Sequence, residues 1–197
     1  MQTVNEIDIE KGAFVCAEAF KMDDLDCYFF SEKESRIVLQ KKLYRFLLNS
    51  SKDNIITTSE NIEGLIIWEK PYTHGSHINI SEMLMGLPLL FDFGITIVRK
   101  ILKYQIFSEK LRKSIIKDPY WYLNMVVVDP FYQGKGYASR LIRPTLMEAE
   151  REKESVYLET HNRNNIILYE QYGFKVIHSE KVDNTEIEHF CMIKEVK

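Results

Sequence analysis

The segment 121–128, WYLNMVVV, constrains the fold more than any other part of the sequence. It is apolar, rich in β-branched and aromatic residues, long enough for a buried strand, and stopped by Asp129-Pro130. A polar stretch with two glycines follows at 131–136, and apolar residues then recur at helical spacing over 138–149. This order predicts a strand, a tight loop and a helix, which is the building unit of an α/β fold.

The rest of the C-terminal half alternates in the same way. We predict a strand at 156–160, a helix at 164–172 that ends at a glycine cap, Gly173, and strands at 174–177 and 189–193. A strand joined to its neighbour by a helix usually runs parallel to it, whereas a hairpin pairs antiparallel strands. We therefore expect an α/β fold with a mixed sheet flanked by helices.

The N-terminal part adds helices, a hairpin and an insertion. Apolar spacing predicts helices at 13–20 and 40–48, a β-hairpin at 55–58 and 64–68, and a helical insertion at about 72–119. No repeat and no linker composition divides the chain, so a single domain over 1–197 is expected.

Composition excludes several classes of partner. Lysine and arginine total 26 against 29 aspartate and glutamate, a net charge of -3, so no basic excess predicts nucleic-acid binding. The apolar segment 83–98 is broken by Gly86, Pro88 and Asp92 and is shorter than the ~20 residues of a membrane span. We therefore expect neither nucleic acid nor a membrane as a partner.

The cysteines and the N-terminal residues bear on the compartment. The 3 cysteines are far apart and form no Cys-x-x-Cys pair, which suits a reducing environment. The first residues are polar and acidic and lack the cationic start and apolar stretch of a secretory signal. A cytoplasmic location is therefore expected.

The loop at 133–138, QGKGYA, is the first candidate site. Successive amides in a glycine loop and the N-terminus of the following helix together favour a phosphate or diphosphate. The loop is not a Walker A motif, because Lys135 is followed by Gly136, nor a Rossmann motif, because Ser139 stands where the third glycine should fall. Spacing alone leaves two interpretations open: an anion site, or a glycine turn with an exposed lysine.

Two signatures resemble the GNAT superfamily of N-acetyltransferases. Segment 126–138, VVVDPFYQGKGYA, resembles its acetyl-CoA motif, Gln/Arg-x-x-Gly-x-Gly/Ala, and segment 168–174, LYEQYGF, is similar to its signature L-Y-x-x-x-G-F. The resemblance is close over 121–177 and implies a mostly antiparallel central sheet with splayed central strands. The residues that further resemble the puromycin N-acetyltransferase-like branch are Arg143-Pro144, Leu158-Glu159-Thr160 and Asn165.

The resemblance implies acetyl-CoA as the acyl donor. In the family, the pantetheine arm of coenzyme A fits between the splayed strands, and the glycine loop cradles the diphosphate. The cofactor-binding residues implied here are Met125, Val126, Val127, Val128, Gln133, Gly134, Lys135, Gly136, Tyr137, Ala138, Asn162, Asn165 and Tyr169. Helix capping is the alternative role for Asn162, since it precedes a predicted helix.

Acetyl transfer to an amine requires a free amine, a polarised carbonyl and a proton for the departing thiolate. Tyr169 matches the family's tyrosine acid; a phenol of pKa ~10 protonates a thiolate of ~8.5 at a cost of ~2 kcal/mol. Backbone N–H near Val126 would stabilise the oxyanion. Glu159 shares one strand face with Tyr157 and His161, and is the candidate catalytic base if that face opens to the cleft. An ion-paired glutamate, His161 as base, and a water chain are the alternatives.

The sequence thus predicts an acetyl-CoA-dependent N-acetyltransferase in which a small-molecule or peptide amine attacks the thioester directly. The competing function is a catalytically inactive coenzyme A-binding sensor or docking module. No metal is expected, because His74 and His77 lack a third ligand at a recognisable spacing. Monomer and homodimer both fit the sequence. Aromatic candidates for the acceptor pocket, which could equally be core, are Tyr28, Phe29, Trp68 and Tyr72.

Overall fold

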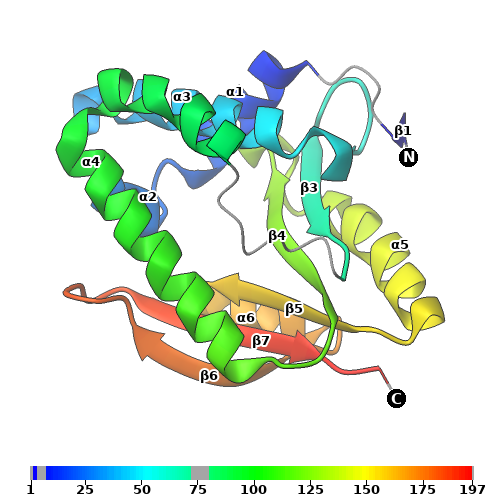
Figure 1. Ribbon diagram of the computed structural model, residues 1–197. Coiled ribbons are helices and arrows are strands. Elements are labelled where there is room, and N and C mark those ends of the chain that lie inside the picture. Colours follow the sequence, from blue (N-terminus) through cyan, green and yellow to red (C-terminus); the bar gives the residue numbers. More distant parts are fainter. Residues whose placement is uncertain (1, 4–7, 72–79, 197) are drawn as a thin grey trace.

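The computed structural model describes residues 2–3, 8–71 and 80–196 (Figure 1). Within them, seven strands form one sheet in the order β1-β2-β3-β4-β5-β7-β6. Only β4 and β5 are parallel; every other neighbouring pair in this sheet is antiparallel. The prediction of a mixed, mostly antiparallel sheet is therefore confirmed. The strands are β1 Gln2–Thr3, β2 Ile55–Thr57, β3 Gly64–Glu69, β4 Tyr120–Val128, β5 Ser155–Thr160, β6 Lys175–Lys181 and β7 Glu188–Lys194.

Helices cover both faces of this sheet (Figure 1). Helices α1 and α3 pack on β2, β3 and β4, and the C-terminal half of α4 packs on the same face over β4, β5 and β7. Helices α5 and α6 bury the opposite face, with two tryptophans, Trp68 and Trp121, at the centre of that core. The helices are α1 Ile9–Phe20, α2 Asp24–Phe29, α3 Lys33–Ser50, α4 Ile80–Ile115, α5 Tyr137–Glu152 and α6 Arg163–Glu170, with short 3-10 turns η1 Lys52–Asn54 and η2 Pro130–Tyr132.

The predicted elements are present, but several boundaries differ. Helix α1 begins before Gly12, at an N-cap formed by Asp8, whose side chain accepts the Lys11 amide. Helix α2 was not predicted; it has only 6 residues, too few for a hydrophobic period, and is capped by Asp23. The sequence placed its helix boundaries by apolar spacing, whereas the caps decide where these helices start.

The helical insertion consists of the single long element α4, which is interrupted at Gly94. The φ of +72° at this glycine is left-handed, so two helical segments meet there in a kink. Residues 72–79 lie outside the described part of the chain, and with them Tyr72, His74 and His77. Among the described residues, no helix is long and apolar enough to cross a membrane.

The central strands part as the resemblance implied. Strands β4 and β5 are in register from Tyr120↔Ser155 to Leu123↔Leu158, and both continue beyond this register without pairing to each other. The β3–β4 register also shifts at this point, between Ile67 and Trp68, which makes a β-bulge at Asn124. The bulge bends β4 at the position where it leaves β5, and Figure 1 shows the two strands diverging.

Candidate functional site

The loop between β4 and α5 has two glycines in the left-handed conformation. Gly134 has a φ of +75° and Gly136 a φ of +82°, and a Cβ at either position would meet no atom within 4 Å. Backbone conformation therefore requires these glycines, and the space in front of them is open. Gly136 is also the N-cap residue of α5 and has no side chain to cap the helix. The first backbone N–H groups of α5 therefore have no side-chain acceptor from the N-cap.

Basic side chains surround this loop, although Lys135 turns back onto it. Its Nζ donates to the Phe131 carbonyl at 3.0 Å and lies 5.0 Å from the centre of the Tyr132 ring. Arg143, nearly two turns into α5, donates to Ser139 Oγ at 2.7 Å. Lys135 stands between the two glycines in sequence, and the N-terminus of α5 follows directly, so positive charge that favours an anionic group is close to the loop.

The strand residues predicted to bind the cofactor can offer their backbone only. The Val127 side chain is buried and the Met125 side chain packs beside it under α1 and α3, while Val126 packs on the opposite core. The Gln133 amide donates to the Val128 carbonyl at 3.2 Å, so this side chain covers the end of β4. Beyond Leu123, β4 has no register with β5, and no described strand pairs with its edge on that side.

Tyr169 lies on α6, in the core beneath the β4–loop–α5 unit. Its ring packs edge-on against Phe174 at 5.8 Å, and its hydroxyl has no hydrogen-bond partner among the described residues. Burial, with a smaller effect of Tyr172, raises the pKa of the Tyr169 phenol to about 12. Tyr169 therefore keeps its proton at neutral pH.

The two asparagines have structural partners. The Asn162 side chain accepts the Asn164 amide at 2.9 Å and caps α6, which is the alternative that the sequence left open. The Asn165 amide donates to Thr160 Oγ1 at 3.2 Å. Both residues lie next to the end of β5, so they border the gap between the strands while holding the start of α6.

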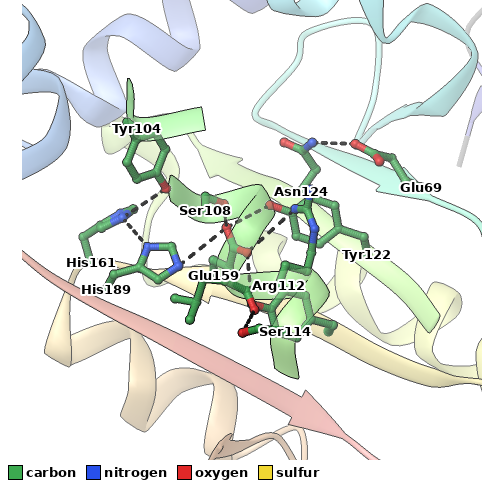
Figure 2. A network of polar contacts seen from close by, with 12 residues as sticks. Glu69, Tyr104, Ser108, Arg112, Ser114, Tyr122, Asn124, Glu159, His161 and His189 are labelled. Atoms are coloured by element: carbon green, nitrogen blue, oxygen red, sulfur yellow. Dashed lines mark hydrogen bonds and ion pairs between the residues drawn. The ribbon is translucent and has the colours of Figure 1, made fainter. Parts of the chain in front are cut away.

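Glu159 is buried on the face of β5 that α4 covers (Figure 2). Its Oε2 accepts from Ser108 Oγ at 2.6 Å and from the Tyr122 hydroxyl at 3.3 Å, and its Oε1 accepts from the Tyr157 hydroxyl at 3.0 Å. Arg112 Nη1 lies 3.7 Å from Oε1. Burial raises the pKa of this carboxyl, and Arg112 opposes that shift. The face does not open directly to solvent at Glu159, because the side chain is only 5% exposed.

A pair of histidines lies beside this carboxylate. His161 Nε2 is 3.0 Å from His189 Nδ1 and 3.1 Å from the Tyr104 hydroxyl, and His189 Nε2 is 3.8 Å from Glu159 Oε2. Burial lowers the pKa of His161 to about 3 and that of His189 to about 4. Both imidazoles are therefore neutral at pH 7.

A cavity of about 1000 Å³ opens next to His161. It lies between α2, the start of α6 and the turn that joins β6 to β7. Tyr28, one of the aromatic candidates, lines it, whereas Phe29 and Trp68 are buried in two separate cores. The lining residues are Asp24, Cys27, Tyr28, His161, Asn162, Arg163, Asn184, Thr185, Glu186, Ile187 and Glu188.

The structure separates the two predicted catalytic groups. Glu159 faces α4, whereas Tyr169 belongs to the core under α5 and α6, so the two lie on opposite faces of β5. His189 and Arg112 were missed by the sequence analysis, because only the packing of β7 and α4 brings them to Glu159. Among the described residues, no group of three or more His, Cys, Asp or Glu could hold a metal ion.

Residues 101–176 match the acetyltransferase (GNAT) domain. The matched segment runs from the second half of α4 through the glycine loop to α6, and so holds the loop, Glu159 and Tyr169.

A curated protein resembles part of this chain in sequence. An uncharacterised N-acetyltransferase of Schizosaccharomyces pombe is 34% identical over 82 residues, which are 40% of this chain and 32% of that protein. The chain thus matches about a third of the length of this curated relative.

Two solved structures share the fold at low identity. One, a histone acetyltransferase HPA2 and related acetyltransferase from Corynebacterium glutamicum, has a TM-score of 0.67 and 20% identity over 96% of this chain and 92% of that one. The other, arylalkylamine N-acetyltransferase 2 of Aedes aegypti, has a TM-score of 0.51 and 18% identity over 79% of this chain and 80% of that one. The fold that this chain shares with the first of these acetyltransferases therefore extends over 96% of the chain.

Proposed function

We propose that this protein is an acetyl-CoA-dependent N-acetyltransferase that moves an acetyl group to a primary amine by direct attack on the thioester. One observation carries the proposal: the uncapped N-terminus of α5 and two open left-handed glycines follow directly on the strand edge that β5 leaves free. A strand edge and a diphosphate cradle in this order suit a long molecule with an amide-rich arm and a phosphate end. The coarse activity has the support of the GNAT domain match.

Coenzyme A would be held mainly by the backbone of β4 and of the glycine loop. The open backbone groups of Met125 to Val128 would pair with the arm, and the amides of Gly134 to Ala138 would hold the diphosphate, with Gln133 and Lys135 at its border. Asn162 and Asn165 border the arm from the β5 side. Bound acetyl-CoA would supply the acyl group in its activated thioester form. The loop needs glycine for its backbone and leaves the space for a ligand, since a Cβ there would touch nothing.

Tyr169 is proposed as the proton donor to the departing thiolate. Its phenol is protonated, buried and without a partner among the described residues, so the proton is not held by another protein group. Transfer from a phenol of pKa about 12 to a thiolate of ~8.5 is uphill by about 3.5 units, or ~5 kcal/mol. This is more than the sequence alone suggested, because burial raises the pKa of the phenol.

The cavity beside His161 is the proposed acceptor site. It adjoins the end of β5, where β4 and β5 part, so an amine in it would approach the gap from the α2 side. Arg163 is tied to Glu188 by two hydrogen bonds of 2.7 Å, whereas Asp24 makes no ion pair within the described residues. The unpaired carboxylate favours an amine that arrives as a cation. Glu159 would take up the amine proton, which requires a relay because it is buried.

Two finer assignments belong to this proposal. The similarity of Arg143-Pro144 and Asn165 to the puromycin N-acetyltransferase-like branch suggests a small-molecule amine, with a peptide amine as the second class of acceptor. A single domain in the cytoplasm, acting as monomer or homodimer, is the organisation we propose for it.

A panel of amines tests the proposal. The protein is incubated with acetyl-CoA and polyamines, aminonucleosides, arylalkylamines or N-terminal peptides in turn, and the release of free coenzyme A thiol is measured. We expect release that depends on one class of amine. Tight binding of acetyl-CoA in calorimetry with no release for any amine would instead indicate the sensor or docking module, and failure to bind would refute both functions.

A further inference from the structure

Three side chains form a line from the acceptor cavity to the buried carboxylate (Figure 2). His161, at the end of β5, lines the cavity and lies 3.0 Å from His189 on β7. His189 in turn lies 3.8 Å from Glu159 Oε2. A proton from the cavity could therefore reach Glu159 in three steps: to His161, to His189 and to the carboxylate. The contact between His189 and Glu159 is the one that must shorten for the last step.

One set of tautomers lets all three side chains of this line pass a proton, and it agrees with the contacts. His189 is 0% exposed, and its Nε2 has no hydrogen-bond partner among the described residues. An N–H at this atom would face Glu159 Oε2, which lies 3.8 Å away. With that proton on Nε2, His189 Nδ1 carries the lone pair and accepts from His161 Nε2–H, and the Tyr104 hydroxyl oxygen, 3.1 Å from the same Nε2, is a second acceptor for it. His161 Nδ1 then carries a lone pair. This atom has no hydrogen-bond partner among the described residues and is not fully buried, so a ligand can reach it.

We propose that His161 accepts the proton of the acceptor amine and that His189 passes it to Glu159. This inference rests on the proposed acetyl transfer. His161 would act as a catalytic residue, since it lines the cavity, whereas His189 would be a positioning residue that acts through its neighbours. Glu159, buried behind both, would be the final proton acceptor rather than the group that meets the substrate.

Atoms and charge balance along the line. The amine N–H bond breaks and its proton binds His161 Nδ1, while the Nε2 proton of His161 moves to His189 Nδ1. The Nε2 proton of His189 moves to Glu159 Oε2, which becomes a neutral carboxylic acid after that contact contracts by roughly 0.8 Å. When the product has left, the proton returns along the same line to water in the cavity, and each imidazole recovers its tautomer.

The surroundings favour neutral imidazoles and a carboxyl that can hold a proton. Burial lowers the pKa of both histidines, so each has a free lone pair at pH 7. Burial raises the pKa of Glu159, and Arg112 opposes this. Tyr104 holds the His161 ring from α4 through its hydroxyl at 3.1 Å. The titratable and charged groups that face the pair are Tyr104 and Arg112 on α4, Glu159 on β5 and His178 on β6.

Kinetics of histidine variants test the relay. His161→Gln and His189→Gln should each lower kcat at least ~10-fold with little change in KM, because both interrupt one proton path. The double variant should be no slower than the slower single variant, within about threefold. Imidazole added to His161→Ala should restore activity in proportion to its neutral form, since the cavity is open at that position. His178→Gln, a histidine on the neighbouring strand outside the line, is the matched control and should keep its kcat.

A second measurement does not depend on activity. Nitrogen NMR of the wild-type protein at pH 7 should show both His161 and His189 as neutral imidazoles protonated on Nε2, and Glu159→Gln should shift the His189 Nε2 resonance. An Nδ1–H tautomer or a charged imidazole at either residue would overturn the relay, even if no amine substrate were found. Multiplicative losses in the double variant, or no imidazole rescue, would overturn it while leaving acetyl transfer itself intact.

Discussion

Tyr169 and Asp26 show how burial sets the protonation of single residues. Tyr169 is 9% exposed, and burial alone accounts for most of the rise in its pKa to about 12. Asp26 is 5% exposed and accepts from the Tyr44 hydroxyl at 2.8 Å and from Gln40 Nε2 at 2.7 Å. These two bonds do not offset desolvation, and the pKa of Asp26 rises from 3.8 to about 6.

Tyr169→Phe should lower kcat by ~10² or more while leaving acetyl-CoA affinity nearly unchanged, because it removes only the proton donor. Because the phenol keeps its proton up to pH about 12, the wild-type rate should not decline through Tyr169 between pH 7 and 10. Steady-state rates and calorimetric titration with acetyl-CoA check both statements. Unchanged turnover would remove Tyr169 from the mechanism.

Asp26 predicts a pH dependence of stability. Between pH about 4 and 6 the folded carboxyl is protonated and the unfolded one is not, so its contribution to the free energy of unfolding falls as pH rises. The free energy of unfolding of Asp26→Asn, relative to that of the wild type, should therefore rise by up to ~3 kcal/mol between pH 4 and pH 7.

The buried histidines act with the opposite sign in an overlapping range, because their lowered pKa values make stability rise with pH. They are present in both proteins and cancel in the difference between wild type and variant. Urea denaturation at several pH values measures that difference. A difference that is constant with pH would show that Asp26 is not desolvated as described.

At the scale of elements, the β4–loop–α5 unit combines a bulge, two left-handed glycines and an uncapped helix. The bulge at Asn124 reverses which face each later residue of β4 takes, so that Met125 and Val127 point toward α1 and α3. The strand thus turns away from β5 while its side chains remain packed. The unit leaves a free strand edge next to a free helix N-terminus, which neither element would provide alone.

Gly136→Val tests this unit. A β-branched residue at a φ of +82° is strained by about 1–3 kcal/mol, and its side chain would also fill the space in front of the loop. Acetyl-CoA affinity should fall at least ~100-fold, or ~2.7 kcal/mol, in calorimetry.

Gly94→Val is the matched control for that variant. Gly94 has a φ of +72° and equally open space, but it lies in the kink of α4. Comparable loss of thermal stability with unchanged acetyl-CoA affinity is expected there. Equal loss of affinity in both variants would mean that strain, and not the site, determines binding.

At the scale of the whole molecule, α4 covers the face of the sheet on which Glu159 lies. Arg112 approaches Glu159 to 3.7 Å and stacks over the Tyr122 ring at 4.4 Å, and Ser108 bonds the same carboxylate. The inserted helix therefore supplies the groups that permit a carboxylate to be buried in the centre of the sheet.

Arg112→Met should destabilise the protein by ~3–5 kcal/mol at pH 8, because the apolar stem is kept while the buried carboxylate loses its cation. The loss should shrink as pH falls, since Glu159 can then take up a proton, and it should be small in a Glu159→Gln background. Lys113→Met is the control: its pair with Glu109 at 2.6 Å is exposed and is worth at most ~0.5 kcal/mol. Chemical denaturation measures the free energy of unfolding of Arg112→Met, Glu159→Gln, their double variant and Lys113→Met. Equal losses in Arg112→Met and Lys113→Met would contradict a stabilising buried pair.

The sequence by itself determined the local parts of this protein. The β-branched run, the glycine loop and the apolar spacing of α5 predicted their elements, because strand and helix periodicities and left-handed glycines are encoded within a few neighbouring residues. The same local signals predicted the mixed sheet and the motif that resembles GNAT enzymes. The short helix α2 was not predicted from the sequence, because its 6 residues are too few to show a hydrophobic period.

Only the tertiary structure decided what surrounds Glu159. Strand alternation predicted that Glu159, Tyr157 and His161 share one face of β5. It did not predict that α4 covers this face, or that β7 brings His189 to it. Tyr169 follows Glu159 by 10 residues in the sequence, and yet the two lie on opposite faces of β5. The physical reason is that desolvation and proton contacts depend on residues distant in sequence, which packing assembles and periodicity does not encode.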